Sequence, residues 1–305
     1  MSTPDPMAQL APLAGLSFTK MTGTGNDFIL MDNRQAKVPK EAMPLLAEAI
    51  CKRSRSVGAD GLILLSPSAR VDPKLGKVDF LWDFFNADGS SAEMCGNGAR
   101  CAARFAVING IAGEEMAFET DAGVIAAQVN GERVRVRMTD PADLDMDKRV
   151  ETRGGPLSLG FVDTGVPHVV LPVGDVDGAD VLELGRELRY HPAFAPQGAN
   201  VNFTALHKDG RIFNRTYERG VEGETLACGT GSVAAALIMA DRANLDSPVT
   251  VVPRSGEALT VYYDKAGDRF HNVFLEGNAR VICTGEFWED AWNWTENGGT
   301  GNGFS

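Results

Sequence analysis

The sequence predicts a mixed α/β fold made of two similar lobes with a cleft between them. Three observations lead to this prediction. The chain has 305 residues, 44% apolar and 23% charged, and so exceeds what one hydrophobic core usually serves. Short strand-like runs follow one another along most of it. A cysteine at the mouth of a Gly-x-Gly turn, followed by an Ala-rich run, occurs twice, at Cys95 and at Cys228.

Composition narrows the class of protein. The net charge is −12, the sequence pI is near 4.9, and dense Lys/Arg blocks are absent, so we expect no nucleic-acid partner. The first residues lack a basic region and a long apolar run, and no stretch approaches the roughly 20 apolar residues of a membrane span. The cysteines are odd in number and scattered, which favours a reducing compartment. We therefore expect a cytoplasmic protein without a membrane partner.

The first half of the chain predicts a series of strands and two helices. Residues 1–15 are expected to form a flexible extension. Helices are expected over residues 40–52, where Met43, Leu46, Ala47 and Ile50 share one face, and from the Cys95 turn to about residue 108. The expected strands cover residues 16–21, 28–31, 61–66, 77–85, 116–120, 123–130 and 133–138. The last of these alternates strictly between basic and apolar residues.

The second half repeats this order of parts. Helices are expected over residues 181–189 and after Gly229, where the run 233–240 has no polar face and should be enclosed by protein on all sides. The expected strands cover residues 157–163, 169–173, 201–206, 211–217, 249–253, 259–263, 272–275 and 279–283. Residues 293–305 are expected to be a loosely ordered tail.

The repeat also predicts the domain boundaries. Aligning residues 85–86 with residues 217–218 brings the two cysteines to within one residue of register. Pro141 and the acidic cluster of residues 140–147 suit a boundary. We expect a first lobe over residues 16–140, completed by about 277–292, and a second lobe over residues 141–276.

Cys95 and Cys228 are the candidate reactive residues. The amides of each glycine turn and the partial positive charge of the helix start form an anion site, and they can lower the pKa of the adjacent thiol into the range of roughly 3.5–7.5. A purely structural role is the alternative, because free cysteine is often buried, and we expect that role for Cys51, Cys101 and Cys283. The sequence lacks the cysteine and histidine spacings typical of zinc sites and the C-x-x-C of thioredoxin-like redox sites. We therefore expect neither a metal nor a redox pair.

Two thiols on either side of one carbon suit proton transfer at a stereocentre. One, as thiolate, removes the α-proton of an amino acid, and the other returns a proton to the opposite face. Backbone amides at two helix starts can stabilise the carbanion through its carboxylate. Closure of the two lobes would exclude water and strengthen these interactions.

Five motifs together resemble the diaminopimelate epimerase family, in matching order and spacing from about residue 16 to residue 285. They are residues 24–28 (TGNDF), 85–90 (FNADGS), 95–100 (CGNGAR), 217–220 (YERG) and 224–231 (ETLACGTG). The resemblance implies a pyridoxal-independent epimerase, without a cofactor, that interconverts LL- and meso-diaminopimelate in lysine and peptidoglycan precursor synthesis. It also implies a homodimer whose subunits have two pseudo-symmetric lobes, each a curved, mostly antiparallel sheet around a central helix.

The resemblance assigns roles to individual residues. Cys95 and Cys228 match the acid/base pair. Residues matching the substrate-binding groups are Asn26, Asn86, Gly96, Asn97, Asn200, Glu218, Arg219, Gly229 and Thr230. An arginine can hold a carboxylate with a bidentate fork, and a glutamate can pair with an ammonium. His168 matches a histidine thought to tune the cysteines, and Glu218 is a second candidate for that role.

Two departures leave the substrate's distal contacts open. Val166 stands where many members have asparagine, and Gly61 where some have glutamine. A proline or hydroxyproline epimerase is an alternative, but the Glu218–Arg219 pair argues against it. A phenazine-pathway isomerase generally lacks the paired thiols. A non-catalytic amino-acid-binding protein or a thiol redox sensor is the alternative from another class.

Overall fold

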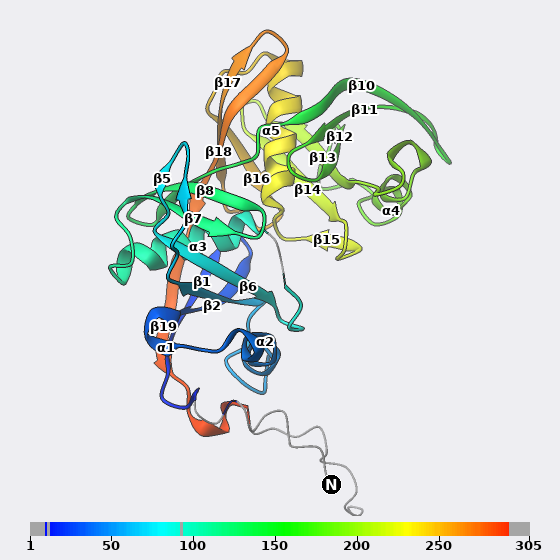
Figure 1. Ribbon diagram of the computed structural model, residues 1–305. Coiled ribbons are helices and arrows are strands. Elements are labelled where there is room, and N and C mark those ends of the chain that lie inside the picture. The colour runs from blue at the N-terminus through cyan, green and yellow to red at the C-terminus, as the bar shows by residue number, and fades with distance from the viewer. Residues whose placement is uncertain (1–9, 11–12, 92–93, 293–305) are drawn as a thin grey trace, which may run out of the picture.

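Two lobes, each built around one helix, make up the molecule (Figure 1). The computed structural model of the chain describes residues 10, 13–91 and 94–292. The helix of the first lobe is α3 (Gly96–Ile108) and that of the second is α5 (Gly229–Ala243). Solved structures with the same architecture, described below, confirm the predicted fold class. The expected tail at residues 293–305 lies outside the described residues.

The first lobe wraps a curved sheet around α3. In spatial order its strands are β19 (Arg280–Glu286), β1 (Ser17–Gly23), β2 (Asn26–Asp32), β3 (Gly61–Ser66), β6 (Phe80–Asn86), β7 (Glu115–Thr120), β8 (Gly123–Asn130) and β9 (Arg133–Arg137). The β2–β3 and β6–β7 pairs are parallel and the others antiparallel. Smaller elements are α1 (Asn33–Ala36), η2 (Lys40–Ala42), α2 (Met43–Ile50), β4 (Val71–Asp72), β5 (Gly76–Lys77) and η4 (Glu289–Ala291).

The second lobe repeats the arrangement around α5. In spatial order its strands are β10 (Ala142–Thr152), β11 (Gly155–Asp163), β12 (Pro167–Pro172), β13 (Asn200–Leu206), β14 (Ile212–Glu218), β16 (Val249–Pro253), β17 (Leu259–Ala266) and β18 (Arg269–Asn278). The β12–β13 and β14–β16 pairs are parallel. Other elements are α4 (Glu183–Arg189), η3 (Pro192–Phe194) and β15 (Gly223–Thr225), which pairs with β14.

The strand registers make the repeat explicit. Phe28 faces Gly61 across the first parallel pair, and His168 faces Asn200 across its counterpart in the second lobe. Gly61 and Asn200 are therefore equivalent positions, and Asn26 is equivalent to Val166. The lobes are joined where β9 pairs with β18, and the chain then crosses back to β19, which pairs with β1.

Burial follows the expected helix and strand patterns. Residues 231–240 of α5 are all buried, which confirms that protein encloses this helix. The alternation of β9 is also confirmed, since Val134 and Val136 are buried while Arg133 and Arg137 are exposed. Alanines on both central helices let the strands pack close.

Two local features differ from the sequence analysis. Leu10 and Leu13, within the predicted N-terminal extension, are buried against the first lobe. The expectation of a buried Cys283 is wrong, because this residue lies on the outer strand β19, where residues 281–284 are exposed.

Candidate active site between the lobes

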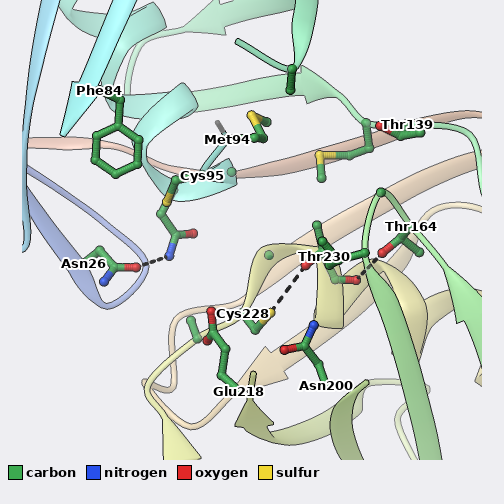
Figure 2. A pocket seen from close by; sticks show the side chains of 18 of the residues that line it. Asn26, Phe84, Met94, Cys95, Thr139, Thr164, Asn200, Glu218, Cys228 and Thr230 are labelled. Carbon is green, nitrogen blue, oxygen red and sulfur yellow. Dashed lines mark hydrogen bonds between the residues drawn. The ribbon is translucent and has the colours of Figure 1, made fainter. Parts of the chain in front are cut away.

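A cavity of about 960 Å³ lies between the lobes and is lined from both sides (Figure 2). All predicted catalytic and substrate-binding residues line it: Asn26, Asn86, Cys95, Gly96, Asn97, Asn200, Glu218, Arg219, Cys228, Gly229 and Thr230. His168 does not line it. The volume of this cavity is at the upper end of the range of about 300–1,000 Å³ that is typical of ligand pockets.

Each cysteine is the N-cap residue of a central helix. Cys95 and Cys228 have extended backbones, and each sulfur accepts a hydrogen bond from the amide three residues later, at Gly98 or Gly231, with a distance of 3.4 Å. The N-cap geometry leaves the first amides of each helix without an intrahelical partner. Both helix starts therefore direct amide donors and a partial positive charge into one cavity.

The two helix starts touch each other through glycine. A Cβ at position 229 would lie 3.8 Å from the Cα of Gly96 and 3.2 Å from Cδ2 of Leu275. A side chain here would therefore crowd Leu275, while its Cβ would be in ordinary contact with Gly96. The two helix starts thus lie close together, and both cysteines line the same cavity.

Burial changes the expected ionisation of the thiols. It raises the pKa of Cys228 to about 12 and also raises the pKa of Cys95, while the backbone amides only partly oppose it. The prediction of lowered thiol pKa values is therefore wrong for the ligand-free cavity. Desolvation disfavours the thiolate more strongly than the turn amides favour it.

Glu218 adds to this effect. Its negative charge raises the pKa of both thiols. Burial raises the pKa of the Glu218 carboxyl itself, and its Oε2 accepts a hydrogen bond of 2.8 Å from Thr225. A half-buried carboxylate near two thiols is a site for a cation such as an ammonium group.

His168 lies behind the cavity wall, completely buried. Its Nδ1 is 3.0 Å from Nδ2 of Asn202, and its Nε2 is 3.5 Å from Nδ2 of Asn200. Burial lowers the pKa of His168 to about 3, so its ring is neutral in the physiological range. It cannot tune the thiols as a cation, and any influence passes through the two asparagines.

The second lobe holds its polar side chains in fixed orientations. The Oδ1 atom of Asn200 accepts a hydrogen bond of 2.8 Å from the backbone amide of Arg219. Thr164 donates to the carbonyl of Thr230 at 3.2 Å, and the Thr230 hydroxyl is 3.5 Å from the sulfur of Cys228. The guanidinium of Arg219 is half-buried at the cavity, where a carboxylate can reach it.

In the first lobe a chain of hydrogen bonds runs along the cavity wall. Asn97 donates from Nδ2 to Oδ1 of Asn26 at 2.7 Å, and Asn26 donates from Nδ2 to Asp60 at 2.9 Å. The Asn86 amide donates to the hydroxyl of Ser90 at 3.0 Å. Both asparagine side chains that the sequence marked in this lobe are thus held by protein partners as well as lining the cavity.

The two departures from the family pattern have different structural settings. Val166 lines the cavity at the position equivalent to Asn26. Gly61 has no room for a side chain, because a Cβ there would lie 2.7 Å from both the Phe84 ring and the carbonyl of Phe85. The ring of Phe84 lines the cavity beside this position (Figure 2).

Several lining residues were not predicted. They include Asp60, Phe84, Met94 and Thr164. Asp60 directly precedes strand β3 (Gly61–Ser66) and is held at the cavity by its hydrogen bond with Asn26. The others follow from tertiary packing and have no local signature.

The described residues show neither a cluster of metal ligands nor a membrane-spanning helix. Among the residues that the structure describes, no group of three or more His, Cys, Asp or Glu side chains is arranged to hold a metal ion. Over the same part of the chain, none of the helices has the length and apolar character needed to cross a bilayer.

Comparison with known proteins identifies the family. The family model described as diaminopimelate epimerase matches residues 18–144 and 160–282. The diaminopimelate epimerase of Aquifex aeolicus is 43% identical over 287 residues, covering 90% of this chain and 99% of the relative. That of Archaeoglobus fulgidus is 44% identical over 255 residues, covering 79% and 87%.

This chain belongs to the diaminopimelate epimerase family. The predicted resemblance is thereby confirmed, and the residues matched include both cysteine turns.

Solved structures extend the fold to more distant proteins. A Bacillus anthracis phenazine biosynthesis protein of the PhzF family aligns with a TM-score of 0.69 at 17% identity, covering 89% of this chain and 98% of that one. An Agrobacterium vitis hydroxyproline epimerase aligns with a TM-score of 0.63 at 16% identity, covering 88% and 91%. At these identities the likeness establishes the shared fold alone. This family member thus shares its architecture with proteins of the classes considered as alternatives.

Proposed function

We propose that this chain interconverts LL- and meso-2,6-diaminopimelate by proton transfer between its two thiols at one α-carbon. The observation that carries the proposal is the placement of Cys95 and Cys228 at two touching helix starts in a single cavity. We infer the substrate from the diaminopimelate epimerase family, to which the chain belongs. The reaction would serve lysine and peptidoglycan precursor synthesis.

The carboxylate at the reacting carbon would bind at the helix starts. The amides of Gly96–Asn97 and Gly229–Thr230 offer donors there, and both helix dipoles favour negative charge. These interactions strengthen as the carbanion forms, because charge moves onto the carboxylate oxygens. Proton transfer thus gains transition-state stabilisation from groups that are already in place.

The proton balance requires one thiolate and one thiol. A thiolate removes the α-proton from one face as the C–H bond breaks, and the opposite thiol gives its proton to the other face. The cysteines exchange protonation states in each turnover. The raised thiol pKa values mean that the active, singly ionised pair forms as pH rises, and it is lost again when both thiols ionise.

The distal end of the substrate would bind to the second lobe and to the asparagines. Arg219 can hold the distal carboxylate and Glu218 can pair with an ammonium. Asn26, Asn86 and Asn200 surround the same cavity. Val166 offers no hydrogen bond, so the distal grip depends more on these groups.

The cellular setting is part of the proposal. We propose a cytoplasmic enzyme, supported by five free cysteines, two of which must stay reduced to act. The homodimer implied by the family resemblance remains a prediction, as do the absence of a cofactor and of nucleic-acid or membrane partners.

An isotope experiment tests the proposed reaction. Purified, reduced protein is incubated with LL-diaminopimelate in deuterated water without added cofactor, and stereoisomers and deuterium are measured by chromatography and mass spectrometry. We expect the meso form to appear with solvent deuterium at its new stereocentre. A Cys228→Ala variant should lose the conversion by about 10³-fold or more. The matched Cys283→Ser variant, altered at an exposed cysteine, should keep it.

The same experiment separates the alternatives. L-proline and trans-4-hydroxy-L-proline are tested in parallel, since the cavity lies in a fold shared with their epimerases. Conversion of either of these without conversion of diaminopimelate would contradict the substrate assignment. Tight binding of diaminopimelate without conversion would favour a non-catalytic binding protein.

A further inference from the structure

An arginine is completely buried beneath the first cysteine turn. Arg100 lies one helical turn after Gly96 on α3, and its side chain is 0% exposed. It donates to the carbonyl of Gly96 at 3.1 Å, to Oγ1 of Thr24 at 2.8 Å and to Oδ1 of Asn97 at 2.8 Å. All three acceptors are neutral. Within the described residues no carboxylate pairs with this guanidinium, and nothing accepts a hydrogen bond from its Nε.

The surrounding structure is shaped to hold this charge. A Cβ at Gly277 on β18 would lie 2.5 Å from Cδ2 of Leu259, 3.1 Å from Nε of Arg100 and 3.3 Å from its Cζ, so glycine lets the strand pass close to both side chains. A buried and incompletely bonded cation is costly, and an apolar residue of similar volume would usually stabilise the fold at least as well. Packing alone therefore does not account for an arginine here.

The second lobe has no equivalent charge. The position of α5 that corresponds to Arg100 is Val233, which is also 0% exposed. Each turn gives its sulfur a hydrogen bond of 3.4 Å from the amide three residues later, and the amide of Asn97 also favours the Cys95 thiolate. The pseudo-symmetric site is thus electrostatically asymmetric.

Arg100 also fixes the direction of the hydrogen bonds that run from Asn97 through Asn26 to Asp60. Because a guanidinium only donates, Oδ1 of Asn97 must face Arg100 and its Nδ2 must face Asn26. At the other end, Asp60 only accepts, so Nδ2 of Asn26 must face it. Neither amide can flip without losing two hydrogen bonds.

We propose that Arg100 is a positioning residue that makes the two thiols unequal, favouring the thiolate of Cys95 over that of Cys228. The inference rests on the proposed function, in which one thiol of the pair is ionised at a time. The buried charge of Arg100 lies beneath the turn of Cys95 and interacts with it. When one thiol of the pair is ionised, the remaining proton is then held mainly on Cys228.

The other charged and titratable groups near the thiols do not reverse this order. The negative charge of Glu218 raises the pKa of both thiols, so it does not favour the Cys228 thiolate. Arg100 also faces Cys101, which is buried and lies outside the cavity, and Glu257, whose carboxylate is paired with Arg280. Near Cys228 the additional donor is the neutral hydroxyl of Thr230, and a full charge in a buried site outweighs such a hydroxyl.

Site-resolved alkylation tests the proposal without any turnover of diaminopimelate. The reduced wild-type protein is treated with iodoacetamide over a range of pH, and the rate at each cysteine is measured by mass spectrometry. The midpoint of each pH profile, rather than the absolute rate, removes differences in accessibility. We expect the Cys95 midpoint to lie at least about one pH unit below that of Cys228. Equal midpoints, or a lower one for Cys228, would overturn the proposal even if every variant failed to fold.

Variants assign the difference to Arg100. Arg100→Met should raise the Cys95 midpoint by about one unit or more and leave that of Cys228 nearly unchanged, and Arg100→Lys should restore much of the difference. The matched control is Arg104→Met, which removes an arginine one turn further along α3 that pairs with Glu132. A purely structural role would instead shift both thiols together, and that result would contradict the inference. Because alkylation is independent of the substrate, failure here leaves the proposed epimerisation standing.

Discussion

The chemistry of the site depends on how the charges of its residues change the pKa values of the two thiols. Cys228 is buried and Cys95 is partly buried, and the negative charge of Glu218 raises the pKa of both thiols. An ammonium group paired with Glu218 would cancel the negative charge that disfavours the thiolates. The substrate would then assist the ionisation of its own base. This coupling accounts for a resting site that is protonated although it must act through a thiolate.

The pH dependence of Glu218→Gln tests this coupling. The pKa of each thiol is raised in part by the Glu218 carboxylate, so its removal lowers both values and moves the acidic limb of kcat/KM toward lower pH. We expect a shift of about one unit, with a higher KM because the ammonium loses its partner. The control is Glu222→Gln, which neutralises a nearby carboxylate that pairs with Arg189. An acidic limb that stayed in place or moved to higher pH would contradict the coupling.

Val166→Asn tests the distal contacts. The substitution places an amide opposite Asn26, at the equivalent position of the second lobe, where Val166 lines the cavity. We expect a lower KM for LL-diaminopimelate, by about threefold to tenfold for one added hydrogen bond, with kcat changed little. Steady-state kinetics of the variant and the parent measure this. An unchanged or higher KM would show that the substrate does not reach this position.

At the scale of elements, the glycine turns decide where the sulfurs lie. A Cβ at Gly231 would overlap Oδ1 of Asn202 and lie 3.2 Å from the sulfur of Cys228. Asn202 in turn contacts His168, so the turn, the buried histidine and strand β13 form one packed unit. The start of α5 therefore cannot move without disturbing its neighbours.

Gly231→Ala should damage both stability and activity. The added methyl group must displace Asn202 or the turn, which we expect to lower the free energy of unfolding by about 1–3 kcal/mol. The control is Gly174→Ala, where a Cβ would meet nothing within 4 Å. Denaturant unfolding and epimerase assays of both variants measure the effect. Wild-type stability and activity in Gly231→Ala would show that the turn is looser than described.

Local patterns predicted these elements well, and tertiary packing explains the misses. The cysteine turns, the enclosed helix α5 and the alternating strand β9 are encoded in neighbouring residues. The direction of the thiol pKa shifts was wrong because burial outweighs the local turn amides. The neutral state of His168 depends on strands far apart in the sequence, and the exposure of Cys283 depends on β19 being an outer strand. Arg100 was seen as part of a motif, but its unpaired burial required the fold.

At the scale of the whole molecule, the lobes meet along a narrow seam. The β9–β18 ladder joins them from Phe274–Arg137 to Asn278–Arg133, and the chain passes between them at residues 138–141 and at Ala279. The cavity beside this seam is large for a small amino acid. Closure about the seam would bring both sets of amides onto one carboxylate and exclude water.

Small-angle scattering tests closure. A Cys95→Ala, Cys228→Ala double variant is measured with and without saturating LL-diaminopimelate, so that turnover does not mix ligands. We expect the radius of gyration to fall on binding, because the lobes approach each other. L-lysine, which lacks the second carboxylate, is the control and should produce no such change. An unchanged radius at demonstrated saturation would mean that the site works without closing.

The central claim is that both sulfurs face one stereocentre, and a crystal structure of the wild-type protein with bound diaminopimelate tests it most directly. We expect the sulfurs of Cys95 and Cys228 on opposite faces of the same α-carbon, each at about 3.5 Å, with its carboxylate on the amides of the two helix starts. A bound substrate whose α-carbon lies near only one sulfur, or whose carboxylate lies away from both helix starts, would contradict it.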